Sequence, residues 1–170
     1  NHLGIKKLDW TVMSHPHADH IGGLVSVVES IPTDTLMDTY SGYGSWTYNH
    51  LIERYTELGT IIKKPKTGEI LQITPKESLL FFAPDSIFSV NQHNVNNASI
   101  VFKLIVGEKS ILFTGDLEHE GDKALIQFGD HLKVDILKVG HHGSITSTTE
   151  KVLSIIKPEL AVVSVGEGNK

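Results

Sequence analysis

The chain has 170 residues, of which 39% are hydrophobic and 21% are charged, as in an ordinary globular protein of one domain. No apolar run approaches the roughly 20 residues that a membrane span requires, no signal peptide is visible, and there is no cysteine from which to infer a compartment. The formal net charge of −5 argues against nonspecific nucleic-acid binding through bulk charge. We predict a single domain over residues 1–170. Because the sequence opens with Asn and reaches an apolar strand at once, we expect it to be a fragment of a longer protein.

The first predicted elements flank a histidine-rich loop. The apolar and β-branched stretch 8–13 indicates a buried strand, and the apolar residues from 21 to about 31 indicate a helix. The loop between them, residues 14–23, reads SHPHADHIGG. It therefore follows the carboxyl end of a strand, which is where open α/β folds bind their ligands.

Four potential metal ligands lie within six positions of this loop: His15, His17, Asp19 and His20. Alternation along an extended chain aims His15 and His17 to one side, and Asp19 and His20, at the start of the helix, can point back toward the same place. Imidazole and carboxylate groups in this arrangement can bind two divalent metal ions. We predict a metal site here rather than a chance gathering of polar loop residues.

The middle of the chain is predicted to contain short strands, one helix and two loops. Apolar residues at helical spacing predict a helix that Ser45 or Thr47 caps and that ends at Gly59. Polar and glycine-rich sequence predicts loops at 40–45 and 85–97. The strands predicted in this part are 35–38, a β-rich stretch from 61, 68–73 and 78–83.

The C-terminal half repeats the design of the first loop twice. Its predicted elements are, in chain order, hairpin strands at 99–106 and 110–114, a helix around 124–128, a strand at 134–139, a helix at 146–156 and a strand at 160–165. The sequence Thr-Gly-Asp places Asp116 directly after a strand, and Gly-His-His-Gly-Ser places His141 and His142 in the same way. The carboxyl ends of strands can bring such residues to one edge of a sheet, so we expect the three blocks to converge.

Together, these blocks resemble the metallo-β-lactamase fold superfamily and, within it, the C-terminal domains of the ComEC family of DNA-uptake channel proteins. The resemblance covers nearly the whole chain, through SHPHADHIGGL, NNASIVFKL, LFTGDLE, DILKVGHHGS and KPELAVVSVG. It implies an α/β fold of the αββα layered type, in which two mixed sheets lie between helices. It also implies a dinuclear metal site at one edge of the sheets.

The resemblance further implies that two divalent ions, zinc or manganese, are held by six ligands. His15 and His17 would bind the first ion, and Asp19 and His20 would bind the second. Asp116 would bridge the two ions. One of His141 and His142 would complete the second site. We favour His142 as the ligand, which leaves His141 facing the substrate.

Two departures from the family pattern bear on this site. The third histidine of the first metal site, expected just before the 99–106 strand, is absent, and the sequence there reads Asn-Asn-Ala-Ser. His93 lies nearby at the wrong offset, and we interpret it as a loop residue. The opening strands that the superfamily carries upstream are also missing from this sequence. The first site is therefore expected to be weaker or to be completed by water.

The chemistry that these residues favour is hydrolysis. Two bridged ions lower the pKa of a shared water, so that hydroxide can attack phosphorus. In this interpretation Asp19 also orients the nucleophile, and His141 donates a proton to the leaving oxygen or holds a phosphate oxygen. Ser144, at a predicted helix start, and Asn97 are candidate substrate contacts, although capping explains hydroxyls at helix starts more often.

From the resemblance we expect a nuclease or phosphodiesterase domain of a membrane DNA-uptake protein, acting on the strand that is not imported. Its partners would be single-stranded DNA and the membrane channel of the parent protein. The parent would lie in the cell membrane, with this domain soluble and extracytoplasmic. Two alternatives stay open: a stand-alone hydrolase of a small phosphodiester, such as a phosphocholine ester, and a noncatalytic module that guides DNA. Because Asp116 supplies an oxygen ligand, β-lactam hydrolysis is disfavoured.

Overall fold

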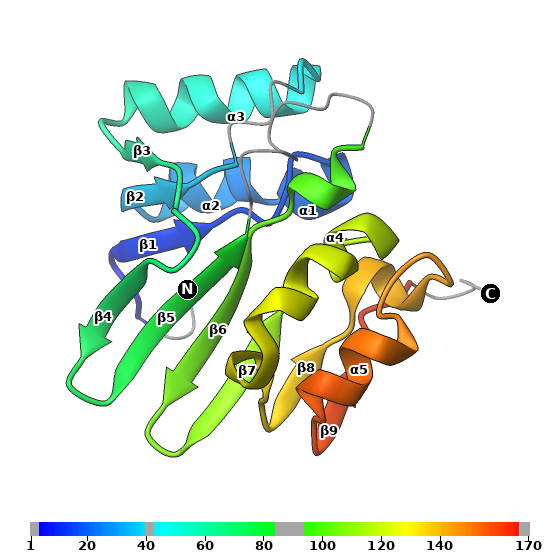
Figure 1. Cartoon of the computed structure of the whole chain (residues 1–170). Helices are drawn as coiled ribbons and strands as arrows, with labels where there is room; N and C mark the ends of the chain where they lie inside the picture. Colours follow the sequence, from blue (N-terminus) through cyan, green and yellow to red (C-terminus); the bar gives the residue numbers. More distant parts are fainter. Residues whose placement is uncertain (1–3, 40–42, 84–93, 167–170) are drawn as a thin grey trace.

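The computed structural model describes residues 4–39, 43–83 and 94–166 and arranges them in four layers, helix, sheet, sheet and helix (Figure 1). The first sheet has three parallel strands in the order β1-β2-β3, and the second has six strands in the order β4-β5-β6-β7-β8-β9. The predicted α/β class with an αββα layering is therefore confirmed, but the expectation of two mixed sheets is wrong for the first sheet, whose three strands are all parallel. Within the described residues, no helix has the length and hydrophobicity needed to cross a membrane.

The first sheet is built from the N-terminal part of the chain. Its strands are β1 (Leu8–Val12), β2 (Thr33–Met37) and β3 (Ile61–Lys63). The helices over its outer face are α1 (Ala18–Ile21), α2 (Leu24–Ser30) and α3 (Trp46–Glu57) (Figure 1). Of the two predicted caps of α3, Ser45 is the one used, because its hydroxyl accepts a hydrogen bond from the Tyr48 N–H at 3.1 Å.

The second sheet contains the remaining strands. They are β4 (Ile70–Thr74), β5 (Glu77–Ala83), β6 (Val101–Val106), β7 (Lys109–Phe113), β8 (Ile136–Lys138) and β9 (Leu160–Val162). Pairing is antiparallel from β4 to β7 and parallel from β7 to β9. The helical segments that follow β5 are η1 (Asn96–Ala98), α4 (His119–Leu125), η2 (Ile126–Leu132), η3 (Gly140–Gly143) and α5 (Glu150–Ile156).

Several predicted boundaries are wrong, including that of the helix around 124–128, where the structure has α4 over 119–125 and η2 over 126–132. The helix expected over 21–31 is divided into α1 and α2 at Gly22 and Gly23, since glycine has a low helix propensity. The helix expected from 146 begins only at Glu150, because Thr148 has a left-handed backbone (φ 52°) that a helix cannot include. The last strand ends at Val162 rather than at 165. Parts of the predicted loops at 40–45 and 85–97 lie outside the described residues.

Three apolar clusters fill the spaces between the four layers. The cluster between the first sheet and its helices comprises Met13, Ile21, Val28, Leu36, Leu51 and Tyr55. The cluster between the two sheets comprises Met37, Leu79, Phe81 and Ile100. The cluster between the second sheet and its helices includes Leu112, Leu125, Leu132, Leu137, Val152 and Ile156. Each pair of neighbouring layers is thus packed through apolar side chains. This packing fixes the positions of the strands whose ends carry the predicted metal ligands.

One backbone contact joins the two sheets beside the histidine-rich loop. The Ile100 N–H, just before β6, donates to the Ser14 carbonyl, just after β1, at 2.7 Å. A second contact joins two loops of the second sheet, since the His141 N–H donates to the Gly115 carbonyl at 3.1 Å. Main-chain bonds therefore hold the end of β1 to the start of β6 and the loops after β7 and β8 to each other, in addition to the apolar clusters.

The core of the second sheet offers a stability test. Leu137 in β8 is fully buried, whereas Leu153 in α5 is 40% exposed. Because a buried leucine loses both its transfer free energy and its packing, we expect Leu137→Ala to lower the free energy of unfolding by about 2–5 kcal/mol. Leu153→Ala, the matched control, should lower it by less than about 1 kcal/mol. Urea denaturation measures both free energies of unfolding. Similar losses in the two variants would contradict the placement of Leu137 in the core.

Candidate metal centre

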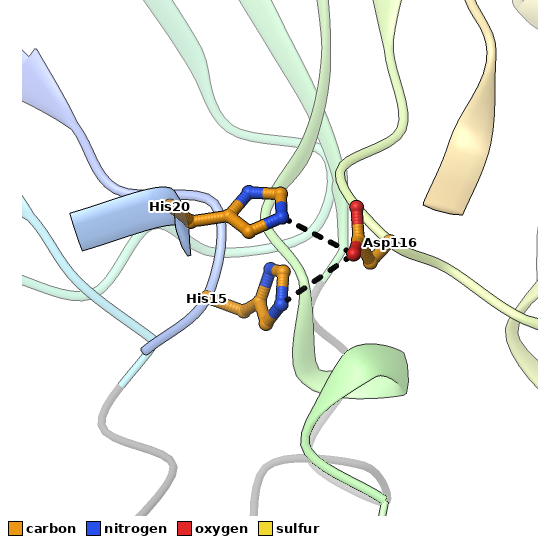
Figure 2. A group of neighbouring side chains, drawn as sticks. All are labelled: His15, His20 and Asp116. Atoms are coloured by element: carbon orange, nitrogen blue, oxygen red, sulfur yellow. Dashed lines mark hydrogen bonds and ion pairs between the residues drawn. The ribbon is translucent and has the colours of Figure 1, made fainter. Parts of the chain in front are cut away.

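Side chains from three strand ends meet at one buried carboxylate oxygen. His15 and His20 follow β1, Asp116 follows β7 and His142 follows β8. The Oδ2 atom of Asp116 lies 3.1 Å from Nε2 of His20, 3.5 Å from Nε2 of His142 and 3.8 Å from Nε2 of His15. Figure 2 shows the imidazoles of His15 and His20 both turned toward this oxygen. Residues as distant in the sequence as His20 and His142, which are 122 positions apart, thus share one small volume.

The second oxygen of Asp116 shows that this cluster suits a cation. The Asp116 side chain is only 4% exposed, and its Oδ1 atom is buried without a hydrogen-bond partner among the described residues. Burial raises the pKa of Asp116, but the hydrogen bond and charge of His20 and the charges of His15 and His142 outweigh it. The pKa is therefore held below its usual value. An ionised, buried and half-satisfied carboxylate is a group that a divalent ion would stabilise.

The nearby His15 is held in the form that binds metals. Burial, followed by the charge of His20, lowers the pKa of His15 to about 3. Its imidazole is therefore neutral at ordinary pH, and neutral imidazole is the metal-binding form.

Two groups of three side chains have the spacing of metal ligands. One comprises His15, His20 and Asp116, and the other comprises Asp19, His20 and His142; within each, the ligand atoms lie within 4.8 Å of one another. In the second group Oδ2 of Asp19 lies 3.7 Å from Nε2 of His20 and 3.5 Å from Nε2 of His142. The two groups share His20, so they form one continuous cluster.

The other two predicted histidines lie beside this cluster but outside both groups. The Nδ1 atom of His17 is 3.0 Å from Nε2 of His15, which places His17 on the His15 side. His141 turns its Nδ1 atom toward Glu118 instead, at 3.3 Å, and its ring centre lies 6.4 Å from that of His142. His93 lies outside the described residues. The ligand roles of these histidines stay predictions.

Partners on the far side of each ring orient the imidazoles of the cluster. The Nδ1 atom of His20 lies 3.0 Å from the Ser14 hydroxyl, and that of His15 lies 3.5 Å from the Ser99 hydroxyl. The Nδ1–H of His142 donates to the Ser164 carbonyl at 2.7 Å. Contacts of this kind turn Nε2 toward the ligand site and fix the tautomer.

Backbone conformation adds to this placement. His141 and His142 both have left-handed φ angles, 43° and 53°, which are uncommon for residues other than glycine and which direct the two side chains to different partners. Gly115 also has a positive φ, and a Cβ atom there would lie 2.6 Å from the Ser99 hydroxyl oxygen. The Thr-Gly-Asp motif therefore requires its glycine for both reasons.

The two predicted substrate contacts lie in different surroundings. The Ser144 hydroxyl is 3.0 Å from that of Thr146, in a loop that precedes α5 rather than at the helix start. Asn97 is buried, and its Oδ1 accepts the N–H groups of Glu118 and Gly121 at 2.9 and 3.2 Å. Asn97 thus anchors the start of α4, and a contact of either residue with substrate stays a prediction.

Sequence reasoning missed the orienting residues of this site. Ser14, Ser99 and Glu118 each lie inside one of the sequence blocks quoted above, but nothing in a linear pattern indicates the histidine that each one contacts. The only available signal was the place of Ser14 and Ser99 at strand boundaries next to the ligand blocks.

Comparison with known proteins gives a consistent match over the whole chain. A family model described as the metallo-beta-lactamase superfamily matches residues 1–167. The chain is 31% identical to ComE operon protein 3 of Bacillus subtilis over 98% of its own length, and 28% identical to competence protein ComA of Neisseria gonorrhoeae over 99%. It spans about a fifth of the length of these curated relatives, 21% and 22% respectively.

Among solved structures, the diiron beta-hydroxylase CmlA from Streptomyces venezuelae is similar in fold. The two superimpose with a TM-score of 0.58 and 13% identity, covering 92% of this chain and 35% of that one. At this identity the likeness concerns the fold alone.

The cluster predicts a stability response to metal. We expect Zn²⁺ or Mn²⁺, at about 100 times its dissociation constant, to raise the thermal unfolding midpoint of metal-stripped protein by about 5–10 °C. Asp116→Asn should remove most of this rise, because it takes away the buried charge. Asp130→Asn, which changes an exposed carboxylate paired with Lys133, should keep it. An equal rise in all three proteins, measured by scanning calorimetry, would place the metal elsewhere.

His15 predicts a pH dependence of the metal-free protein. In the unfolded chain His15 binds a proton near pH 6.5, whereas in the folded protein it does so only near pH 3. Between these values the unfolded state holds more protons, so the free energy of unfolding falls as the pH falls. We expect His15→Gln to reduce this slope between pH 7 and pH 5 by up to about 1.4 kcal/mol per pH unit. Urea denaturation at several pH values measures this slope. An unchanged slope in His15→Gln would refute the lowered pKa of His15.

Proposed function

The chain belongs to the metallo-β-lactamase superfamily, and from this membership we propose that it is a metal-dependent phosphodiesterase domain that cleaves DNA. The observation that carries the proposal is that His20 and His142 both face the buried Oδ2 atom of Asp116. A hydrolase in this fold needs divalent ions at the strand ends, and these side chains supply the mixed imidazole and carboxylate donors that such ions take.

We propose the following roles for the residues of the cluster. His15 and His17 hold one divalent ion, zinc or manganese. Asp19, His20 and His142 would hold a second, and Asp116 would be the ligand that both ions share. When bound, the ions activate water and neutralise charge on a phosphate.

Two residues act on the substrate in this proposal. Asp19, whose side chain is 64% exposed, orients the nucleophile through its carboxylate. His141 stands outside both groups of ligand atoms, which leaves it available to exchange a proton with the leaving oxygen.

The choice of DNA rests on the competence proteins that this chain resembles. One is named a competence protein and the other is named for the ComE operon, and both match nearly the whole chain at 28–31% identity. We propose that the domain belongs to a longer membrane protein of DNA uptake, works outside the cytoplasm, and processes the strand that is not imported. Its formal charge of −5 does not favour DNA, but two divalent ions would make the site itself locally positive.

Hydrolysis of a single-stranded oligonucleotide by metal-stripped protein, with Mn²⁺ or Zn²⁺ added back, tests the proposal. We expect metal-dependent cleavage that falls at least about 100-fold in Asp116→Asn, because the variant loses the shared ligand. Asp130→Asn should cleave like the wild type, and gel analysis of end-labelled DNA gives the rates.

Other outcomes distinguish the alternatives. Turnover of bis(p-nitrophenyl) phosphate without any DNA cleavage would favour a hydrolase of small phosphodiesters. Metal binding with no turnover of either substrate would contradict the enzyme assignment and favour a module that guides DNA, as the missing third histidine suggests.

A further inference from the structure

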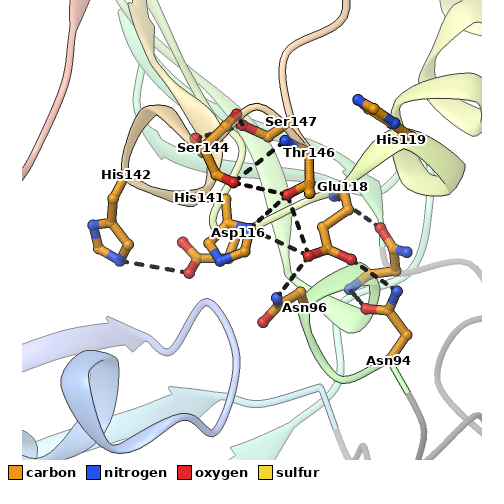
Figure 3. A network of polar contacts seen from close by, with 12 residues as sticks. Asn94, Asn96, Asp116, Glu118, His119, His141, His142, Ser144, Thr146 and Ser147 are labelled. Carbon is orange, nitrogen blue, oxygen red and sulfur yellow. Dashed lines mark hydrogen bonds and ion pairs between the residues drawn. The ribbon is translucent and has the colours of Figure 1, made fainter. Parts of the chain in front are cut away.

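Glu118 stands at the centre of a polar network beside the metal cluster (Figure 3). Its side chain is 20% exposed. The Oε2 atom accepts the amide of Asn94 at 2.9 Å, and Oε1 accepts the amide of Asn96 at 3.2 Å and the Thr146 hydroxyl at 3.4 Å. The same Oε1 lies 3.3 Å from Nδ1 of His141. Four groups, two from residues 94–96 and two from residues 141–146, therefore converge on one carboxylate.

This network does not serve the helix that Glu118 precedes. Glu118 is the N-cap residue of α4, but its side chain forms no capping hydrogen bond. The asparagines that donate to it belong to the segment in which a third metal-binding histidine was expected. Their amides fix the carboxylate from one side, so that its remaining acceptor capacity faces His141.

Both the backbone and the Nδ1 atom of His141 are held by contacts. Its backbone is left-handed and its N–H donates to the Gly115 carbonyl at 3.1 Å. Its Nδ1 atom faces Glu118 and also lies 3.1 Å from the Thr146 hydroxyl. Among the described residues none forms a hydrogen bond or ion pair with Nε2, and the ring is next to that of His142. Nε2 is therefore the nitrogen of His141 that no described residue engages.

We propose that Glu118 is the positioning residue of His141. A carboxylate can only accept, so it keeps the proton of the neutral ring on Nδ1 and leaves the lone pair of Nε2 for the substrate. This inference rests on the proposed function. During hydrolysis Nε2 takes one proton from the attacking water as the new P–O bond forms, and returns it to the leaving oxygen as the old P–O bond breaks. The ring ends neutral, and no further reactant is needed.

The first experiment determines the tautomer of His141 and does not depend on enzymatic turnover. Long-range ¹⁵N–¹H correlation spectra of the zinc-loaded protein should show His141 protonated on Nδ1. The signal is assigned with His141→Asn, a residue that tolerates the left-handed backbone. In Glu118→Gln the population should move toward the Nε2–H form. Glu120→Gln removes the same charge from an exposed residue of the same helix, and should leave the spectrum of His141 unchanged.

The second experiment measures phosphodiester hydrolysis by the same proteins. We expect Glu118→Gln to lower kcat by about 10- to 100-fold with KM within about threefold of the wild type. The double variant with His141→Asn should be no slower than His141→Asn alone, because the two residues act as a unit. The loss should shrink on a substrate whose leaving group is p-nitrophenolate, which needs no proton.

An unchanged His141 tautomer in Glu118→Gln, or additive effects in the double variant, would overturn the inference. A wild type that hydrolyses no phosphodiester would overturn the proposed function instead, and the tautomer comparison still decides whether Glu118 places the ring. Equal unfolding midpoints of the wild type and Glu118→Gln exclude a general loss of structure.

Discussion

The carboxylate of Asp116 is an ionised group placed almost entirely out of water, with one oxygen facing three imidazoles and the other without a partner in the described part of the chain. Burying such a charge costs several kcal/mol unless its surroundings compensate it. The residues around Asp116 can be understood from the need to compensate this buried charge. The Gly115 backbone brings Asp116 close to Ser99, and the serine hydroxyls behind His15 and His20 keep the Nε2 atoms turned inward. A cation bound at this place would complete what the described residues leave unsatisfied.

The four-layer fold makes this arrangement possible. Three apolar clusters fix the separation of the layers, and the main-chain bond from Ile100 to Ser14 closes the edge at which the sheets meet. The same fold in CmlA supports a diiron beta-hydroxylase, so the layers alone do not determine a reaction. In this chain the donor set and the relatives favour hydrolysis, and the surroundings of His141 favour a specific acid–base role for that residue.

Much of the fold was predictable because it depends on local patterns. Apolar runs identified the strands, and each ligand block follows a strand end as expected. The boundaries that failed depend on backbone conformations imposed by packing, such as the left-handed Thr148 before α5. Contacts across the chain were not predictable either. The sequence indicates that a histidine is missing near Asn96, but only the structure indicates that Asn96 donates to Glu118, which is 22 positions away.

The ligand groups draw on both sheets, since His20 belongs to the first and Asp116 and His142 to the second. An ion held between His20 and Asp116 would therefore act as a cross-link, closing a loop of chain whose ends are 96 residues apart. Closing a loop of that size restricts the unfolded chain much as a disulfide does, in a sequence that has no cysteine. Metal supply would then govern how firmly the two halves of the sandwich stay together, as well as whether the site is active.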